Sequence, residues 1–131
     1  MAKALVLYHS QQFGNTKKMA EAVAEELNGE KCEVTLHNTN EGRFDITKYP
    51  QFDCVAFGTP DYFSYMAGTI KTFLDDCYIK RNEPGYQARP YVVFFTHGGG
   101  GRGREAVTLF KRLGTRWEKR LSAKVPLTHR L

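Results

Sequence analysis

Short apolar runs alternate with segments of helical periodicity along most of this chain. Ala4–Tyr8, Cys54–Phe57 and Tyr91–Phe95 are continuously apolar, as strands buried on both faces of a sheet are. Over 19–27 and 70–77, apolar residues recur every three or four positions, which is typical of amphipathic helices. Because strand and helix alternate, the strands should be parallel and joined by right-handed crossovers. The sequence therefore predicts an α/β fold with a doubly wound parallel sheet.

Weaker patterns complete this fold. Apolar and polar residues alternate over 32–36, which predicts an edge strand with one wetter face. A short helix fits before Pro50, and Gly58 is expected to end the strand that precedes it. Apolar spacing over 106–117 predicts a last long helix, and Val125–Leu127 could begin a fifth strand, which Pro126 would confine to an edge.

The composition is that of a soluble globular chain. With 131 residues, 41% of them hydrophobic, the chain can bury a core, and we expect a single domain over 1–131. No run approaches the roughly eighteen apolar residues of a membrane span. No cleavage pattern follows the first apolar run, and the three cysteines form no CxxC pair. These features predict a cytoplasmic protein with no membrane partner, whose cysteines pack as small hydrophobes.

Positive charge gathers near the carboxyl end. From Arg102 onward there are nine cations and two acids, so the preceding residues carry −2 of the net +5. We favour a solvated helix face over a binding patch, although attraction to an acidic protein or to nucleic acid stays open. Only two aromatic residues, Phe110 and Trp117, lie among these cations, which argues against a base-stacking groove and against nucleic acid as the partner.

The first of three loops after the strands has features of a phosphate site. Ligands of open parallel sheets bind beyond the carboxyl ends of the strands, where Ser10–Thr16 opens directly into a helix. Hydroxyls, amides and free N–H groups of the helix start suit a phosphate there. The same residues also fit an ordinary helix N-cap at Asn15 or Thr16. This loop alone does not decide between a phosphate site and an N-cap.

Other nucleotide and phosphate motifs are absent from the loop. It contains neither GxxxxGK[ST] nor GxGxxG. A response-regulator receiver needs acidic residues after the first strand and an aspartate ending the third. Here the first strand ends in Tyr8, His9 and Ser10, and Asp53 precedes the third strand instead of ending it. The sequence therefore does not fit a response-regulator receiver.

The other two loops could complete a site for a planar ligand. Gly58–Gly68 carries Tyr62, Phe63 and Tyr65, which could stack on a ring or simply pack against the loop. Thr96–Gly103 contains four consecutive glycines, which let the backbone approach a ligand closely or form a mobile turn.

Together the three loops resemble those of the flavodoxin superfamily. They are most similar to the branch of tryptophan-repressor-binding-protein-type NAD(P)H:quinone oxidoreductases. The resemblance covers about Ala4 to Leu113. It rests on Val6–Ser10 with Gly14–Thr16, on Phe57–Pro60 with Met66–Gly68 and Lys71–Asp75, and on Thr96–Glu105.

The resemblance implies strand order 2-1-3-4-5 and FMN as the cofactor, with the chemistry carried out by the flavin. The residues that it assigns to FMN lie in the three loops. They are Ser10, Gln12, Phe13, Gly14, Asn15 and Thr16 at the phosphate, Thr59, Pro60, Asp61, Tyr62 and Phe63 along the ring, with Tyr62 or Phe63 on its face, and Thr96, His97, Gly98, Gly99 and Gly101 at the pyrimidine end.

Two departures from the family pattern affect these expectations. Phe13 makes the phosphate loop one residue longer than usual, so the phosphate ligands can differ in detail. The family continues through strand five into a final helix, whereas this sequence ends at Leu131. We therefore expect a short or missing fifth strand, no final helix, and apolar surface that a second subunit of a homodimer could cover.

Two classes of function remain. The first is a flavoprotein acting in electron transfer, or as a small NAD(P)H-dependent flavin or quinone oxidoreductase. Arg102, Arg104 and His97 near the third loop would stabilise anionic reduced flavin, raise its potential and suit an acidic redox partner. The alternative is a flavin-free interaction module that uses the basic C-terminal helix.

Overall fold

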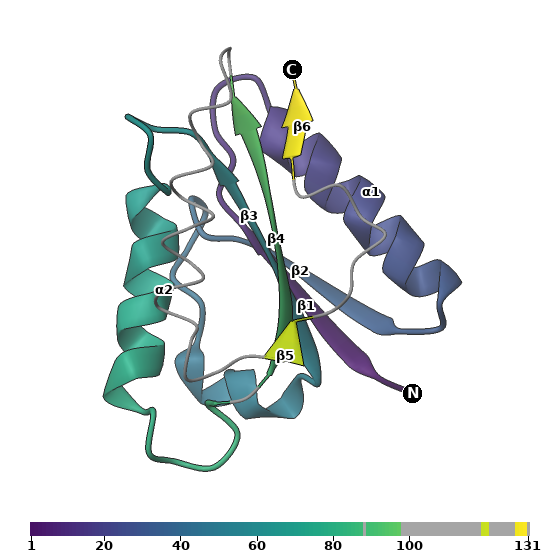
Figure 1. The fold of residues 1–131 in the computed structure, drawn as a ribbon, viewed down its shortest axis with the longest axis vertical. Coiled ribbons are helices and arrows are strands. Elements are labelled where there is room, and N and C mark those ends of the chain that lie inside the picture. Colours follow the sequence, from purple (N-terminus) through teal and green to yellow (C-terminus); the bar gives the residue numbers. More distant parts are fainter. Residues whose placement is uncertain (88, 98–118, 121–127, 131) are drawn as a thin grey trace.

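The computed structural model describes residues 1–87, 89–97, 119–120 and 128–130 (Figure 1). Over residues 3–97, strands and helices alternate as predicted. In chain order the elements are β1 (Lys3–Tyr8), α1 (Asn15–Gly29), β2 (Glu33–Asn38), the 3-10 helix η1 (Ile46–Gln51), β3 (Cys54–Pro60), α2 (Gly68–Ile79), β4 (Pro90–His97), β5 (Lys119–Arg120) and β6 (Thr128–Arg130).

The strands form one parallel sheet in the order β2-β1-β3-β4-β5, which confirms the predicted doubly wound, flavodoxin-like topology. β2 lies at an edge, as its alternating pattern predicts. The two-residue β5 pairs with the start of β4, and β6 pairs with the end of β4. The helix predicted over 106–117 and the strand start predicted at Val125–Leu127 lie outside the described residues.

The continuous apolar runs have a direct structural cause, because helices cover both faces of the sheet (Figure 1). Successive side chains of a strand point to opposite faces. Leu5 and Leu7 of β1 belong to the core cluster shared with α2 and η1, whereas Val6 and Tyr8 belong to the cluster shared with α1. The result is three layers, with the carboxyl ends of β1, β3 and β4 together at one end of the sheet.

β3 continues beyond the residue expected to end it. Gly58 pairs with Phe94 in the ladder, and Thr59 and Pro60 extend the strand. A Cβ at Gly58 would lie 2.3 Å from the ring of Phe94, which is fully buried. Glycine is therefore required here for packing rather than for a turn. η1 likewise differs in detail, because Pro50 lies inside the short helix rather than after it.

Candidate functional site

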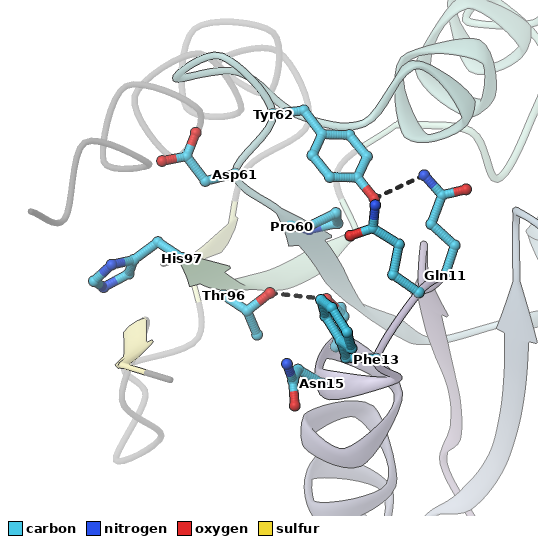
Figure 2. Close-up of a pocket in the computed structure, with 10 residues that line it drawn as sticks. Gln11, Phe13, Asn15, Pro60, Asp61, Tyr62, Thr96 and His97 are labelled. Atoms are coloured by element: carbon cyan, nitrogen blue, oxygen red, sulfur yellow. Dashed lines mark hydrogen bonds between the residues drawn. The ribbon is translucent and has the colours of Figure 1, made fainter. Parts of the chain in front are cut away.

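The loops after β1 and β3 and the end of β4 line a cleft of about 170 Å³ at the carboxyl edge of the sheet (Figure 2). Most of the residues predicted for the site line it. They are Gln12, Phe13, Asn15 and Thr16 from the first loop and α1, Pro60, Asp61 and Tyr62 from the end of β3, and Thr96 and His97 from the end of β4. Gln11 also lines the cleft and was not among the predicted residues, although it belongs to the same loop.

The first loop turns tightly into α1. Gln12 and Gly14 both adopt left-handed backbone conformations, with φ of 54° and 70°. Gly14, not Asn15 or Thr16, is the N-cap residue of α1, and it has no side chain with which to cap the helix. The Ser10 hydroxyl accepts a hydrogen bond from Lys17 N at 3.2 Å. The ordinary N-cap interpretation therefore does not describe this helix start.

At this turn, two main-chain N–H groups have no partner within the described part of the chain. Those of Asn15 and Thr16 have no hydrogen-bond acceptor among the described residues. Left-handed turns and the first turn of a helix both direct such donors at one point and favour an anion there. The start of α1 can therefore bind a phosphate through the backbone.

Asn38, at the end of β2, fixes the base of the loop and was not predicted. Its Oδ1 accepts from Ser10 N at 3.1 Å, and its Nδ2 donates to Ser10 O at 3.1 Å. This reciprocal pair places Ser10 beside the sheet rather than in the cleft lining. The available signal was a polar residue at the carboxyl end of a predicted strand, the position at which α/β sites gather.

The second loop places its two adjacent aromatic residues differently. Tyr62 lines the cleft, and its hydroxyl accepts a hydrogen bond from Gln11 Nε2 at 2.9 Å (Figure 2). Tyr62 and Tyr65 also exchange two backbone hydrogen bonds of 3.0 Å. Phe63, with φ of 54°, is fully exposed and does not line the cleft. Tyr62 and Phe63 were the two aromatic residues predicted to contact the face of a flavin ring, and of these two only Tyr62 lies in the cleft.

Thr59 supports this loop from beneath instead of lining the cleft. It is fully buried, and its hydroxyl donates to Pro60 O and accepts from Ala67 N, both at 2.9 Å. One side chain thus joins the end of β3 to the residue that precedes α2.

The remaining wall carries polar atoms that lack partners. The hydroxyls of Thr96 and Thr16 form a 2.9 Å hydrogen bond, and Asp61 N donates to Thr96 O at 2.8 Å. Asp61 Oδ1 and His97 Nδ1 are buried without a hydrogen-bond partner in the described part of the chain. Buried polar atoms are normally satisfied, so these two suit a ligand with hydroxyl or N–H groups. The predicted glycines Gly98, Gly99 and Gly101, and both nearby arginines, lie outside the described residues.

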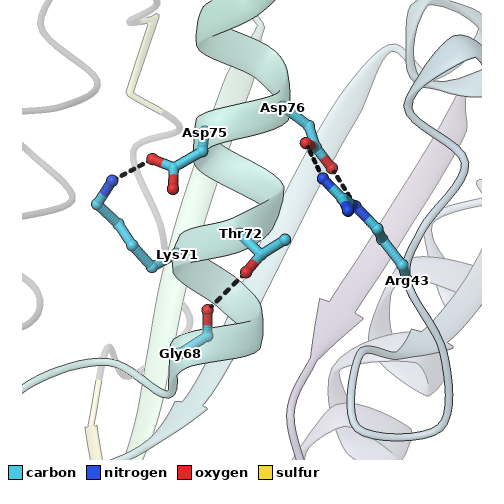
Figure 3. A network of polar contacts seen from close by, with 6 residues as sticks. All are labelled: Arg43, Gly68, Lys71, Thr72, Asp75 and Asp76. Carbon is cyan, nitrogen blue, oxygen red and sulfur yellow. Dashed lines mark hydrogen bonds and ion pairs between the residues drawn. The ribbon is translucent and has the colours of Figure 1, made fainter.

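A second hollow of similar volume lies between α2 and the loop after β2. Its arginine, Arg43, already forms two hydrogen bonds with Asp76, of 3.0 and 2.6 Å (Figure 3). Thr72 in its lining donates to Gly68 O at 3.1 Å (Figure 3). Because these groups are paired within the protein, the hollow is a weaker ligand site than the cleft.

Neither a metal-binding cluster nor a membrane-spanning helix is found in the described part of the chain. It contains no group of three or more His, Cys, Asp or Glu residues arranged to bind a metal. None of its helices has the length and apolarity to cross a membrane.

Comparison with known proteins gives the family. A family model described as the flavodoxin domain matches residues 5–125, and the chain belongs to this family. Among solved structures, a flavodoxin from the domain Archaea is 20% identical, with a TM-score of 0.75, covering 98% of this chain and 84% of that one. The flavodoxin-like fold expected from the three loops is therefore confirmed.

Two further solved structures are similar to this chain. The first is a WrbA-like protein, from the branch that the sequence resembles, and the second is a flavoenzyme. A WrbA-like protein from Agrobacterium tumefaciens is 23% identical with a TM-score of 0.72, covering 88% of this chain and 73% of that one. FerB, an NAD(P)H:(acceptor) oxidoreductase from Paracoccus denitrificans, is 16% identical with a TM-score of 0.77, covering 97% of this chain and 79% of that one. At these identities the likeness is one of fold.

Proposed function

We propose that the cleft binds FMN, with the phosphate at the turn into α1. The observation that carries this proposal is the pair of N–H groups, of Asn15 and Thr16, that have no acceptor among the described residues and lie beside two left-handed residues at the helix start. A Cβ at Gly14 would meet no atom within 4 Å, so there is room above the turn. A dianionic phosphate gains both hydrogen bonds and the favourable helix dipole there.

The rest of the cleft fits the other parts of FMN. The Tyr62 ring offers an aromatic wall, held by Gln11, for a planar isoalloxazine. Asp61 Oδ1 and His97 Nδ1 lack partners among the described residues and suit the ribityl hydroxyls or the ring N–H. Ser10 and Thr59 would act by shaping the two loops, and Phe63 could reach the ring only if its loop moved.

Bound flavin supplies one-electron and two-electron transfer, and the chain supplies position and electrostatics. We propose a role in electron transfer to a redox partner protein, or in NAD(P)H-dependent reduction of flavins or quinones. The family membership and the likeness to FerB support this class of reaction. A cytoplasmic setting is proposed because Cys32, Cys54 and Cys77 are all free thiols.

Titration of the purified protein with FMN and with riboflavin tests the proposal. We expect quenched flavin emission and a shifted visible band at one FMN per chain. Riboflavin should bind at least tenfold more weakly, because it lacks the phosphate. If neither flavin binds at large excess, the flavoprotein proposal fails and a flavin-free interaction module becomes the better account.

A further inference from the structure

A line of buried and partly buried hydrogen bonds begins at His9, whose ring contacts Tyr62. His9 follows β1, is 5% exposed, and its Nδ1 lies 2.6 Å from the Thr69 hydroxyl at the start of α2. Thr69 Oγ1 lies 2.7 Å from Thr39 Oγ1, and the Thr39 hydroxyl donates to Tyr8 O at 3.2 Å. These bonds connect the ends of β1 and β2 with the first turn of α2.

The number of hydrogen bonds that can form along this line indicates which nitrogen of the His9 imidazole carries the proton. If Thr39 donates to Tyr8 O, Thr69 donates to Thr39 and His9 Nδ1–H donates to Thr69, so three hydrogen bonds form. In the reverse direction Thr39 donates to Thr69 and Thr69 to His9 Nδ1, so only two form. Nε2 has no partner in the described part of the chain in either arrangement. The additional hydrogen bond therefore favours the first arrangement.

The other contact of His9 reaches the cleft. Its ring meets the Tyr62 ring edge to face, with centroids 5.7 Å apart and an interplanar angle of 81°. Tyr62 is thus held on one side by Gln11 and on another by His9. Burial lowers the pKa of His9, which agrees with a neutral ring in this position.

We propose that His9 is a positioning residue for the cleft, a neutral Nδ1–H imidazole that Thr69 and Thr39 lock in place and that sets the angle of the Tyr62 ring. The consequence for flavin binding rests on the proposed function, whereas the tautomer and the Tyr62 contact do not. Tyr62 is then coupled to the start of α2 through side chains that do not line the cleft.

The first test uses ¹⁵N-labelled protein without ligand. A long-range ¹H–¹⁵N spectrum of the histidine rings should show a protonated Nδ1 and a bare Nε2 for the ring whose signals disappear in His9→Phe. A bare Nδ1 with a protonated Nε2, or a charged ring at neutral pH, would overturn the proposal. This measurement needs neither flavin nor a folded threonine variant.

The second test removes the link to α2. Thr69→Val should shift the Tyr62 ring resonances and weaken FMN binding about fivefold to tenfold, the effect of one lost hydrogen bond. Thr69→Ser keeps the hydroxyl and should restore both readouts. Thr72→Val is the matched control, because Thr72 lies one turn later and its hydroxyl donates to Gly68 O within the same helix.

The outcomes separate this inference from the proposed function. Unmoved Tyr62 resonances and unchanged FMN affinity in Thr69→Val would sink the inference and leave FMN binding intact. Shifted Tyr62 resonances in a protein that binds no flavin would support the positioning role and reject the proposed function. An equal effect of Thr72→Val on Tyr62 would also count against the inference, because it would reflect general loosening of α2.

Discussion

Gly14 is the residue on which the shape of the first loop depends most directly. Its φ of 70° lies in the left-handed region, which costs an L-residue about 1–2 kcal/mol. Gly14→Ala should therefore lower the free energy of unfolding by about 1 kcal/mol and weaken FMN binding by turning the neighbouring N–H groups. Chemical denaturation and FMN titration measure the two effects.

Gly42→Ala is the control for that prediction. Gly42 lies outside the left-handed region and also has open space around its Cβ position. Its variant should behave as the wild type. Equal behaviour of the two variants would mean that the left-handed turn at Gly14 is not needed for the site.

Gly58 depends on packing rather than on backbone conformation. An added Cβ would lie 2.3 and 2.4 Å from two ring atoms of the buried Phe94. Gly58→Ala should destabilise the protein by about 1–3 kcal/mol, as overpacking of a core does. Urea denaturation of Gly58→Ala and of the double variant with Phe94→Leu tests the cause, since the smaller side chain should recover part of the loss. Unchanged stability in the single variant would refute the contact.

The placement of some single residues could not be predicted from the sequence. Tyr62 and Phe63 are adjacent aromatics, yet one lines the cleft and the other is fully exposed. The difference comes from the left-handed φ of Phe63 and Ser64, which no periodicity reports. Asn38 and His9 were missed for a related reason, since their roles depend on partners that are distant along the chain.

Between elements, the contact of α1 with β4 depends on a pair of threonines. The hydroxyls of Thr16 and Thr96 are buried and lie 2.9 Å apart. Thr16→Val should cost about 1–3 kcal/mol, because it leaves the Thr96 hydroxyl buried without this partner. The double variant with Thr96→Val should cost less than the sum of the two single changes. A double-mutant cycle with additive losses would show that the pair is not a coupled hydrogen bond.

Element boundaries were predicted less well than element types. The helices and strands over residues 3–97 appear where the periodicity places them, because burial sets both the pattern and the structure. β3 extends three residues and β4 two residues past their apolar runs, since the ladder continues through Gly58–Pro60 and Thr96–His97. Burial produces a hydrophobic pattern that can be recognised in the sequence, whereas backbone hydrogen bonding between strands produces no such pattern.

For the molecule as a whole, buried titratable groups set the pH range of stability. Burial raises the pKa of the Cys77 thiol and the Tyr49 phenol from 9.0 and 10.0, and lowers that of His9 from 6.5. Above pH 9 the unfolded chain loses protons that the folded state holds, and below pH 6.5 it gains one that the folded state resists. The free energy of unfolding should therefore fall on both sides of a plateau between these values.

Urea denaturation across this pH range measures the plateau. Cys77→Ala should make the alkaline decline shallower, because one of the buried acids is gone. Stability that stays constant from about pH 8 to about pH 10.5 would contradict the burial of these groups in the folded state.

The parallel sheet and the place of the candidate cleft were predictable from the alternation of strand and helix, whereas the strand order was implied by the resemblance to the flavodoxin superfamily. Parallel strands place their carboxyl ends together, so Gln12, Pro60 and Thr96 meet although they are far apart along the chain. The geometry of the free N–H groups at α1 could not be predicted, since it depends on the conformations of Gln12 and Gly14.

The central claim is that FMN binds with its phosphate at the start of α1, and backbone amide resonances test it most directly. On addition of one equivalent of FMN, the amide signals of Gln12, Phe13, Asn15 and Thr16 should shift strongly and saturate, whereas riboflavin should shift mainly those near Tyr62. Amide signals that stay unmoved at excess FMN, or that shift only around Arg43 and Thr72, would contradict the account.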